Sequence, residues 1–187
     1  MKRNEMTAFK LTLKYIVISF IAVFGSFFFH ELFHWIAGEL LGYKMTMTLN
    51  SVFLAQGNYR QPWHEYFISA AGPAFTLLQA IAVFIIIQRY KNIYLYPFLF
   101  FPLYMRLLAA LLSFINPNDE ARISKSLGLG SFTLFILICA VLFFLVTRIS
   151  KQEHYTKKFQ WINVLLAMVF SSVIILADQF LHIHLIN

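Results

Sequence analysis

Hydrophobic residues along the chain fall into five long stretches that are separated by short polar segments. Each stretch is long enough to cross a bilayer, which takes roughly 20 helical residues. The predicted spans are residues 15–41, 63–87, 93–115, 127–147 and 161–183. The pattern therefore predicts an all-α polytopic membrane protein with about five transmembrane helices.

The polar segment between the first two spans shows a strand-like pattern of apolar and polar residues rather than a helical one. Residues 45–49 alternate between apolar and polar side chains, as a strand does. Asn50 and Ser51 can turn the chain before the apolar run 52–55. We therefore expect either a short membrane-associated β-like hairpin after the first span or an irregular interfacial loop.

Composition supports the membrane assignment. Of the 187 residues, 60% are hydrophobic and only 12% are charged, whereas a soluble domain has about 25% charged residues. This excludes a sizeable soluble domain, so residues 1–187 are treated as one transmembrane domain embedded in the lipid bilayer. The net charge of +7 comes from Lys and Arg at the ends of apolar runs, which argues against a nucleic-acid partner.

The same charges predict an orientation. With a cytoplasmic amino terminus, ten Lys and Arg residues lie inside and four lie outside: Lys44, Arg60, Arg122 and Lys125. The positive-inside rule favours this arrangement. The chain is therefore predicted to be a multi-pass protein of the cell membrane with its amino terminus in the cytoplasm.

A His-Glu-x-x-His motif, from His30 to His34, lies toward the end of the first span. Residues four apart share one face of a helix, so both imidazoles can reach one metal ion. Ionisable groups inside a bilayer are costly unless they are paired or functional. These residues predict a zinc site, with Glu31 placed to act as a general base on water.

A third metal ligand is expected on the same side of the membrane as His30 and His34. Catalytic zinc takes three protein ligands and leaves a fourth position for water. The first and third spans run in the same direction, so Asp119, which follows the third span, emerges beside the histidines. Asp119 is predicted as the ligand, with Glu120 as its substitute. The alternative is that Asn116, Asn118 and Asp119 cap a short helix.

Other polar residues fall in or near the spans. Asp178 and His182 are four apart near the end of the fifth span, where they either support or replace Asp119 or are simple interfacial residues. Together with Asn116 and Glu120 they are candidates for contacts that support the metal ligands. Arg106 lies in the third span and is expected to pair with Asp178 or Glu39, or to stabilise a developing oxyanion.

A second motif joins the first in the next span. Gly72 and Pro73, followed by Thr76, resemble the Gly-Pro-x-x-Asn segment of the site-two proteases, which are intramembrane zinc metalloproteases. The core of that family has three spans that carry His-Glu-x-x-His, Gly-Pro and an Asn/Pro-rich motif with a ligand aspartate. All three appear here in that order, within a predicted core of residues 15–128. Residues 127–187 add two further spans.

The resemblance implies an intramembrane endopeptidase that cleaves a membrane-embedded protein or peptide. The implied zinc ligands are His30, His34 and Asp119, and the implied base is Glu31. It also implies that the hairpin pairs with an unwound substrate segment. The residues expected to bind substrate there are Met47, Leu49 and Val52.

The chain departs from the family pattern in three ways. Thr76 stands where the family has asparagine, and the third motif, residues 116–120, lacks the usual Leu-Asp-Gly. The family's site opens toward the cytosol, whereas the charge count places this one outside.

The competing function is a non-catalytic membrane protein, either a metal transporter or a partner-binding pseudoprotease. The sequence identifies neither the substrate nor the oligomeric state.

Overall fold

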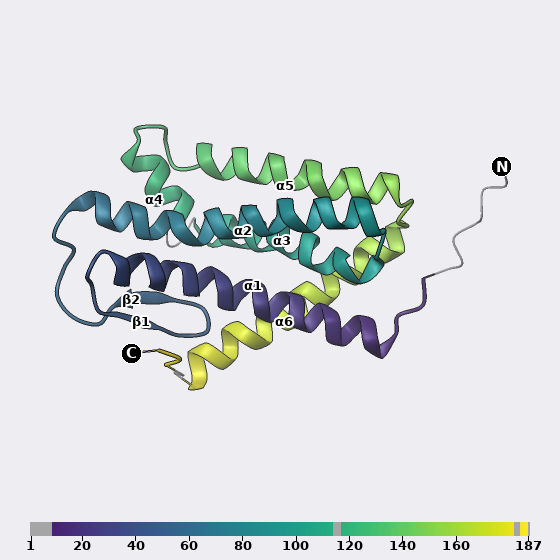
Figure 1. Ribbon diagram of the computed structural model, residues 1–187, viewed down its shortest axis with the longest axis horizontal. Helices are drawn as coiled ribbons and strands as arrows, with labels where there is room; N and C mark the ends of the chain where they lie inside the picture. Colours follow the sequence, from purple (N-terminus) through teal and green to yellow (C-terminus); the bar gives the residue numbers. More distant parts are fainter. Residues whose placement is uncertain (1–8, 114–116, 182–183, 187) are drawn as a thin grey trace.

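The computed structural model describes residues 9–113, 117–181 and 184–186. It confirms an all-α architecture with five long apolar helices and a two-stranded hairpin after the first (Figure 1). The helices are α1 (Leu13–Leu40), α2 (Pro62–Tyr90), α3 (Tyr96–Leu112), α4 (Asp119–Ser126), α5 (Thr133–Gln152) and α6 (Lys157–Leu181), with a 3₁₀ turn η1 (Ile93–Leu95) before α3. All but α4 belong to apolar segments long enough to span a bilayer, as in a multi-pass membrane protein.

Two helices begin away from their predicted positions. The fourth span was expected from residue 127, but α5 begins at Thr133. Gly128 and Gly130 have φ values of 70° and 81°, a conformation that ends a helix and that glycine adopts without strain. Helix α6 starts at Lys157 rather than residue 161, because the polar residues before Trp161 continue the helix beyond its apolar stretch.

Helices α1, α2 and α3 pack against one another, α5 covers α2 and α3, and α6 crosses α1 and contacts α3. The Tyr15 hydroxyl donates to Asn163 Oδ1 at 2.8 Å, which ties α1 to α6 inside the bundle. Helices α1, α3 and α6 run in the same direction, so their carboxyl ends gather at the end that carries α4 and the hairpin (Figure 1). The polar residues of these three ends can therefore meet.

The hairpin consists of β1 (Met45–Met47) and β2 (Val52–Leu54), paired antiparallel with Thr46 opposite Phe53. This confirms the hairpin rather than the irregular loop. Residues 48–51 form the turn, where the Thr48 N–H donates to the Ser51 carbonyl at 2.9 Å. The register places the backbone groups of Met45 and Met47 on the outer edge of β1 and those of Val52 and Leu54 on the outer edge of β2.

The chain itself covers the outer edge of β1. The Met45 N–H donates to Glu39 at 2.8 Å, and the Trp35 indole donates to the Met45 carbonyl at 3.2 Å. Farther along, the Met47 N–H donates to the Ile186 carbonyl at 2.9 Å, and the Leu185 N–H donates to the Met47 carbonyl at 2.8 Å. Of the two strands, only β2 therefore presents an open edge among the described residues.

Candidate metal centre

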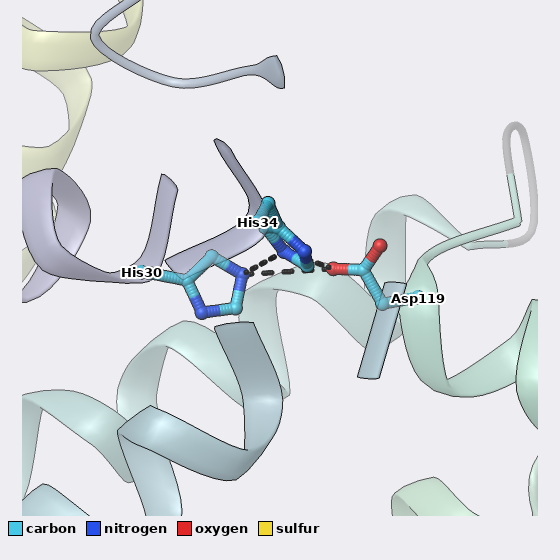
Figure 2. Close-up of side chains that lie close together, drawn as sticks. All are labelled: His30, His34 and Asp119. Carbon is cyan, nitrogen blue, oxygen red and sulfur yellow. Dashed lines mark hydrogen bonds and ion pairs between the residues drawn. The ribbon is translucent and has the colours of Figure 1, made fainter. Parts of the chain in front are cut away.

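Three side chains from two helices converge at this end of the bundle (Figure 2). His30 and His34 project from successive turns of α1, and their Nε2 atoms lie 3.2 Å apart. Asp119 Oδ2, from α4, lies 3.5 Å from His30 Nε2 and 3.3 Å from His34 Nε2. Both imidazoles are buried. The group can hold a metal ion, which is the convergence that helix direction predicted.

Hydrogen bonds on the far side of each ring orient its Nε2 atom inward. The Thr76 hydroxyl donates to the Gly72 carbonyl at 2.9 Å, so it accepts the proton of His30 Nδ1, also at 2.9 Å. His34 Nδ1 donates to the Ile68 carbonyl at 2.6 Å. Such contacts select the tautomer whose Nε2 carries a lone pair. Thr76 thus orients the His30 ring through its hydroxyl.

The donor set fits a tetrahedral cation. With both Nδ1 atoms protonated, two nitrogen lone pairs and a carboxylate oxygen face one another without a proton between them. These atoms repel unless a positive charge lies at their centre. Tetrahedral zinc with bonds near 2.0–2.1 Å separates its ligand atoms by about 3.3 Å, and the separations here are 3.2–3.5 Å.

Helix α4 resolves whether Asp119 acts as a cap or faces the histidines. Asn118 is the N-cap, and its side chain accepts from the Ala121 N–H at 2.9 Å. Asp119 is left free of that role, and Arg122 Nη2 donates to its Oδ1 at 2.7 Å. Asn116 lies outside the described residues.

Glu120 points away from the histidines, so its proposed role as a substitute ligand does not fit the structure. Its carboxylate is buried and forms an ion pair with Arg106 of α3. Adjacent residues on a helix point about 100° apart, so Asp119 and Glu120 cannot both face the metal group. The expected pairing of Arg106 with Asp178 or Glu39 is wrong, because a nearer carboxylate from α4 occupies the guanidinium.

Asp178 holds the hairpin instead of the metal group. Its two carboxylate oxygens accept from the Thr48 hydroxyl and from the Leu49 N–H, each at 2.9 Å. This contact fastens the β1–β2 turn to α6. Asp178 is therefore placed neither to replace Asp119 nor to contact the imidazoles directly. His182 lies outside the described residues.

Asp178→Ala should loosen the hairpin turn without removing metal. The Leu49 N–H would lose its acceptor, at a cost of about 1–2 kcal/mol, so hydrogen exchange at this amide should accelerate roughly tenfold. Asp178→Asn keeps one acceptor oxygen and should show a smaller effect. Exchange mass spectrometry and metal analysis check both results. Loss of metal from Asp178→Ala would instead place this carboxylate in the metal site.

A cavity of about 440 Å³ opens beside the metal group. Glu31 and His34 line one side of it, and Asn50, Ser51 and Val52 of the hairpin line another. Glu31 is buried at this wall, next in sequence to the first histidine. Its carboxylate thus shares one cavity with the metal group and with the end of β2.

The predicted substrate residues of the hairpin differ in their positions. Val52 lines the cavity, and its strand has an open outer edge. Met47 is fully buried, and its outward backbone groups are bonded to Leu185 and Ile186. The backbone N–H of Leu49 is bonded to Asp178. Strand pairing with another segment is consequently open to β2 and closed to β1.

Arg122 and Gly72 contribute to the site in ways that the sequence did not predict. Arg122 lies three residues after Asp119, the spacing at which side chains meet on a helix, so its bond to that carboxylate had a readable signal. For Gly72 the Gly-Pro motif singled out the residue, but no spacing predicted that it lies against the imidazoles. A Cβ atom at Gly72 would lie 2.3 Å from His34 Nε2 and 2.7 Å from His30 Cε1. The absence of a side chain there makes room for the metal group.

Comparisons with known protein families, with curated proteins and with solved structures find no match to this chain. The function therefore has to be inferred from the site.

Proposed function

We propose that the protein is an intramembrane zinc metalloendopeptidase that cleaves a membrane-embedded protein or peptide. The observation that carries this proposal is the convergence of His30, His34 and Asp119 on one point, beside a cavity that Glu31 also lines. A metal-storage or transport site needs the three ligands but has no use for an adjacent carboxylate on the same cavity.

Zinc is the metal that this donor set favours. Two imidazole nitrogens and one carboxylate oxygen at tetrahedral spacing match the catalytic His₂-carboxylate class, which keeps a fourth position open. When bound, zinc supplies Lewis acidity that polarises a carbonyl group and allows water to lose a proton near neutral pH. Thr76 and Ile68 hold the two rings in the tautomer that such a cation requires.

Glu31 is assigned the proton transfers. Its carboxylate accepts a proton from the attacking water as the water oxygen bonds to the peptide carbonyl carbon. It then delivers that proton to the amide nitrogen as the C–N bond breaks. The products are a carboxylic acid, which then loses its proton to water, and a free amine.

The open edge of β2 is assigned to the substrate. A transmembrane helix hides its peptide bonds in internal hydrogen bonds, so a segment must unwind before water can attack it. An extended segment can replace those bonds by pairing with the outward backbone groups of Val52 and Leu54. Because Val52 lines the same cavity as Glu31, a segment paired there would lie beside the base.

The order of motifs supports the same proposal. His-Glu-x-x-His, Gly-Pro and the segment bearing Asp119 occur in the order found in site-two proteases. The additional spans α5 and α6 are not part of that resemblance.

The test is Glu31→Gln. This change removes the base but leaves the three metal-binding side chains, so metal content should stay at the native level while cleavage falls by about 10²–10⁴-fold. Proteomic comparison of membranes that contain the native or the variant protein would reveal the substrate as a fragment lost in the variant. Glu153→Gln is the matched control, since it makes the same change at the end of α5 and does not line the cavity.

An identical fragment pattern in the native and Glu31→Gln membranes would contradict the proposal. It would favour the non-catalytic alternative, in which the metal site binds a partner or an ion without hydrolysis.

A further inference from the structure

A second and larger cavity lies at the opposite end of the bundle, between α5 and α6. Both helices pack on α3, yet no Cα atom of α5 lies within 8 Å of one in α6. The two helices diverge from the connection that joins them (Figure 1). The groove between them has a volume of about 840 Å³, within the range of about 300–1,000 Å³ typical of small-molecule sites.

The walls of this groove are apolar along most of its length. Phe100 and Leu103 of α3 form the floor, and Phe143 and Val146 of α5 form one wall. Phe143 is 61% exposed, so the groove opens sideways to the surroundings of the bundle. In a bilayer, that opening faces the acyl chains of the lipids.

One end of the groove is polar. Gln160 of α6 donates to the Ser150 hydroxyl of α5 at 2.8 Å, and the Tyr96 hydroxyl lies 2.9 Å from the same oxygen. These contacts close the groove beside the connection. Lys151 and Lys157 line the same end, one from each helix.

Neither lysine is engaged in an ion pair within the described structure. Each is exposed. The nearest acidic residue in sequence, Glu153, accepts from Gln152 instead. This is also the end of the bundle predicted to face the cytoplasm, where the leaflet is rich in anionic lipids.

We propose that this groove is a binding site for an anionic phospholipid. One acyl chain would lie along Phe100, Leu103 and Val146, and the headgroup phosphate would lie between Lys151 and Lys157. An occupant with an apolar chain and a compact negative head satisfies both parts of the groove. An apolar helix from a partner protein would leave the two ammonium groups without a counter-charge.

The test compares lipid retention in the purified full-length protein. Native mass spectrometry should show stronger retention of phosphatidylglycerol than of phosphatidylcholine with the same acyl chains. Lys151→Gln combined with Lys157→Gln should weaken phosphatidylglycerol binding about tenfold or more, because each lysine adds about fivefold to anionic attraction. Phosphatidylcholine retention should not change.

The matched control is Arg148→Gln combined with Lys158→Gln. It removes the same charge from the same end of the bundle but changes residues that do not line the groove. Equal loss of phosphatidylglycerol in the two double variants would overturn the proposal, since general surface charge would then explain the preference. Equal retention of the two lipids by the native protein would overturn it as well.

A groove-filling variant supplies a second measurement with both lysines present. Thr147 lines the groove and is half-buried, so Thr147→Trp should occupy the volume of the acyl chain and reduce retention of both lipids. If Thr147→Trp instead released a bound membrane protein while the lysine changes did not, the groove would belong to a partner helix. Metal content and the effect of Glu31→Gln are independent of all these outcomes.

Discussion

Asp119→Ala is expected to strip the protein of stoichiometric metal. Residues that merely support a ligand contribute about 10–100-fold to metal affinity, so loss of a direct ligand should exceed about 100-fold. The variant would leave two facing imidazole nitrogens, 3.2 Å apart, without the anionic oxygen that completes the group. Inductively coupled plasma mass spectrometry on protein purified without chelators measures the change directly, and proteolysis should be lost with the metal.

Unfolding of α4 would not explain that loss, because Asn118 rather than Asp119 caps the helix. The control is Arg122→Ala, which frees Asp119 Oδ1 but leaves Oδ2 beside the histidines. It should keep its metal with at most a moderate drop in affinity. A full complement of metal in Asp119→Ala would refute the assignment, and neither Glu120 nor Asp178 could replace Asp119 without breaking its present contacts.

Gly72→Ala is expected to be nearly as damaging, although it adds only one methyl group. The new carbon would lie 2.3 Å from His34 Nε2 and within 2.8 Å of two atoms of the His30 ring. It would thus collide with both ligand nitrogens, and one or both rings would have to turn away. Alanine favours a helix over glycine by about 1 kcal/mol, so weakening of α2 cannot account for a loss of metal.

Gly25→Ala is the matched control, because a Cβ atom there meets nothing within 4 Å. We expect this variant to bind metal like the native protein. Cobalt substitution adds a sensitive readout, since the visible spectrum of Co²⁺ reports tetrahedral coordination, and Gly72→Ala should abolish it. A native cobalt spectrum in Gly72→Ala would show that the imidazoles do not occupy the positions described here.

Much of the fold was predictable because its signals are local. The apolar stretches, the alternation of residues 45–49 and the spacing of His30 and His34 each reflect the period of one element. Helix direction then predicted that Asp119 would emerge on the side of the histidines, and the structure brings the three together. The start of α5 was predicted wrongly because the apolar run begins at Leu127. Gly128 and Gly130, with positive φ values, delay the helix until Thr133.

The contacts around the metal group were less predictable because they join residues that are distant along the chain. Asp178 fastens a turn 129 residues away, and residues 185–186 cover the outer edge of β1. No period or spacing encodes such a pairing. The predicted partner of Arg106 was wrong for the same reason. Several carboxylates were available, and only the packing of the helices selects one of them.

The amino-acid order alone determined that the chain has five segments long enough to cross a membrane. It also places His30 and His34 on successive turns of the first helix, with the Glu31 carboxylate beside the first of them. Those properties follow from hydrophobicity and helical period, which act within single segments. Only the tertiary structure decided which carboxylate completes the metal group, which strand keeps an open edge and why Gly72 has no side chain. Those outcomes depend on distances between segments, and packing of the whole bundle sets them.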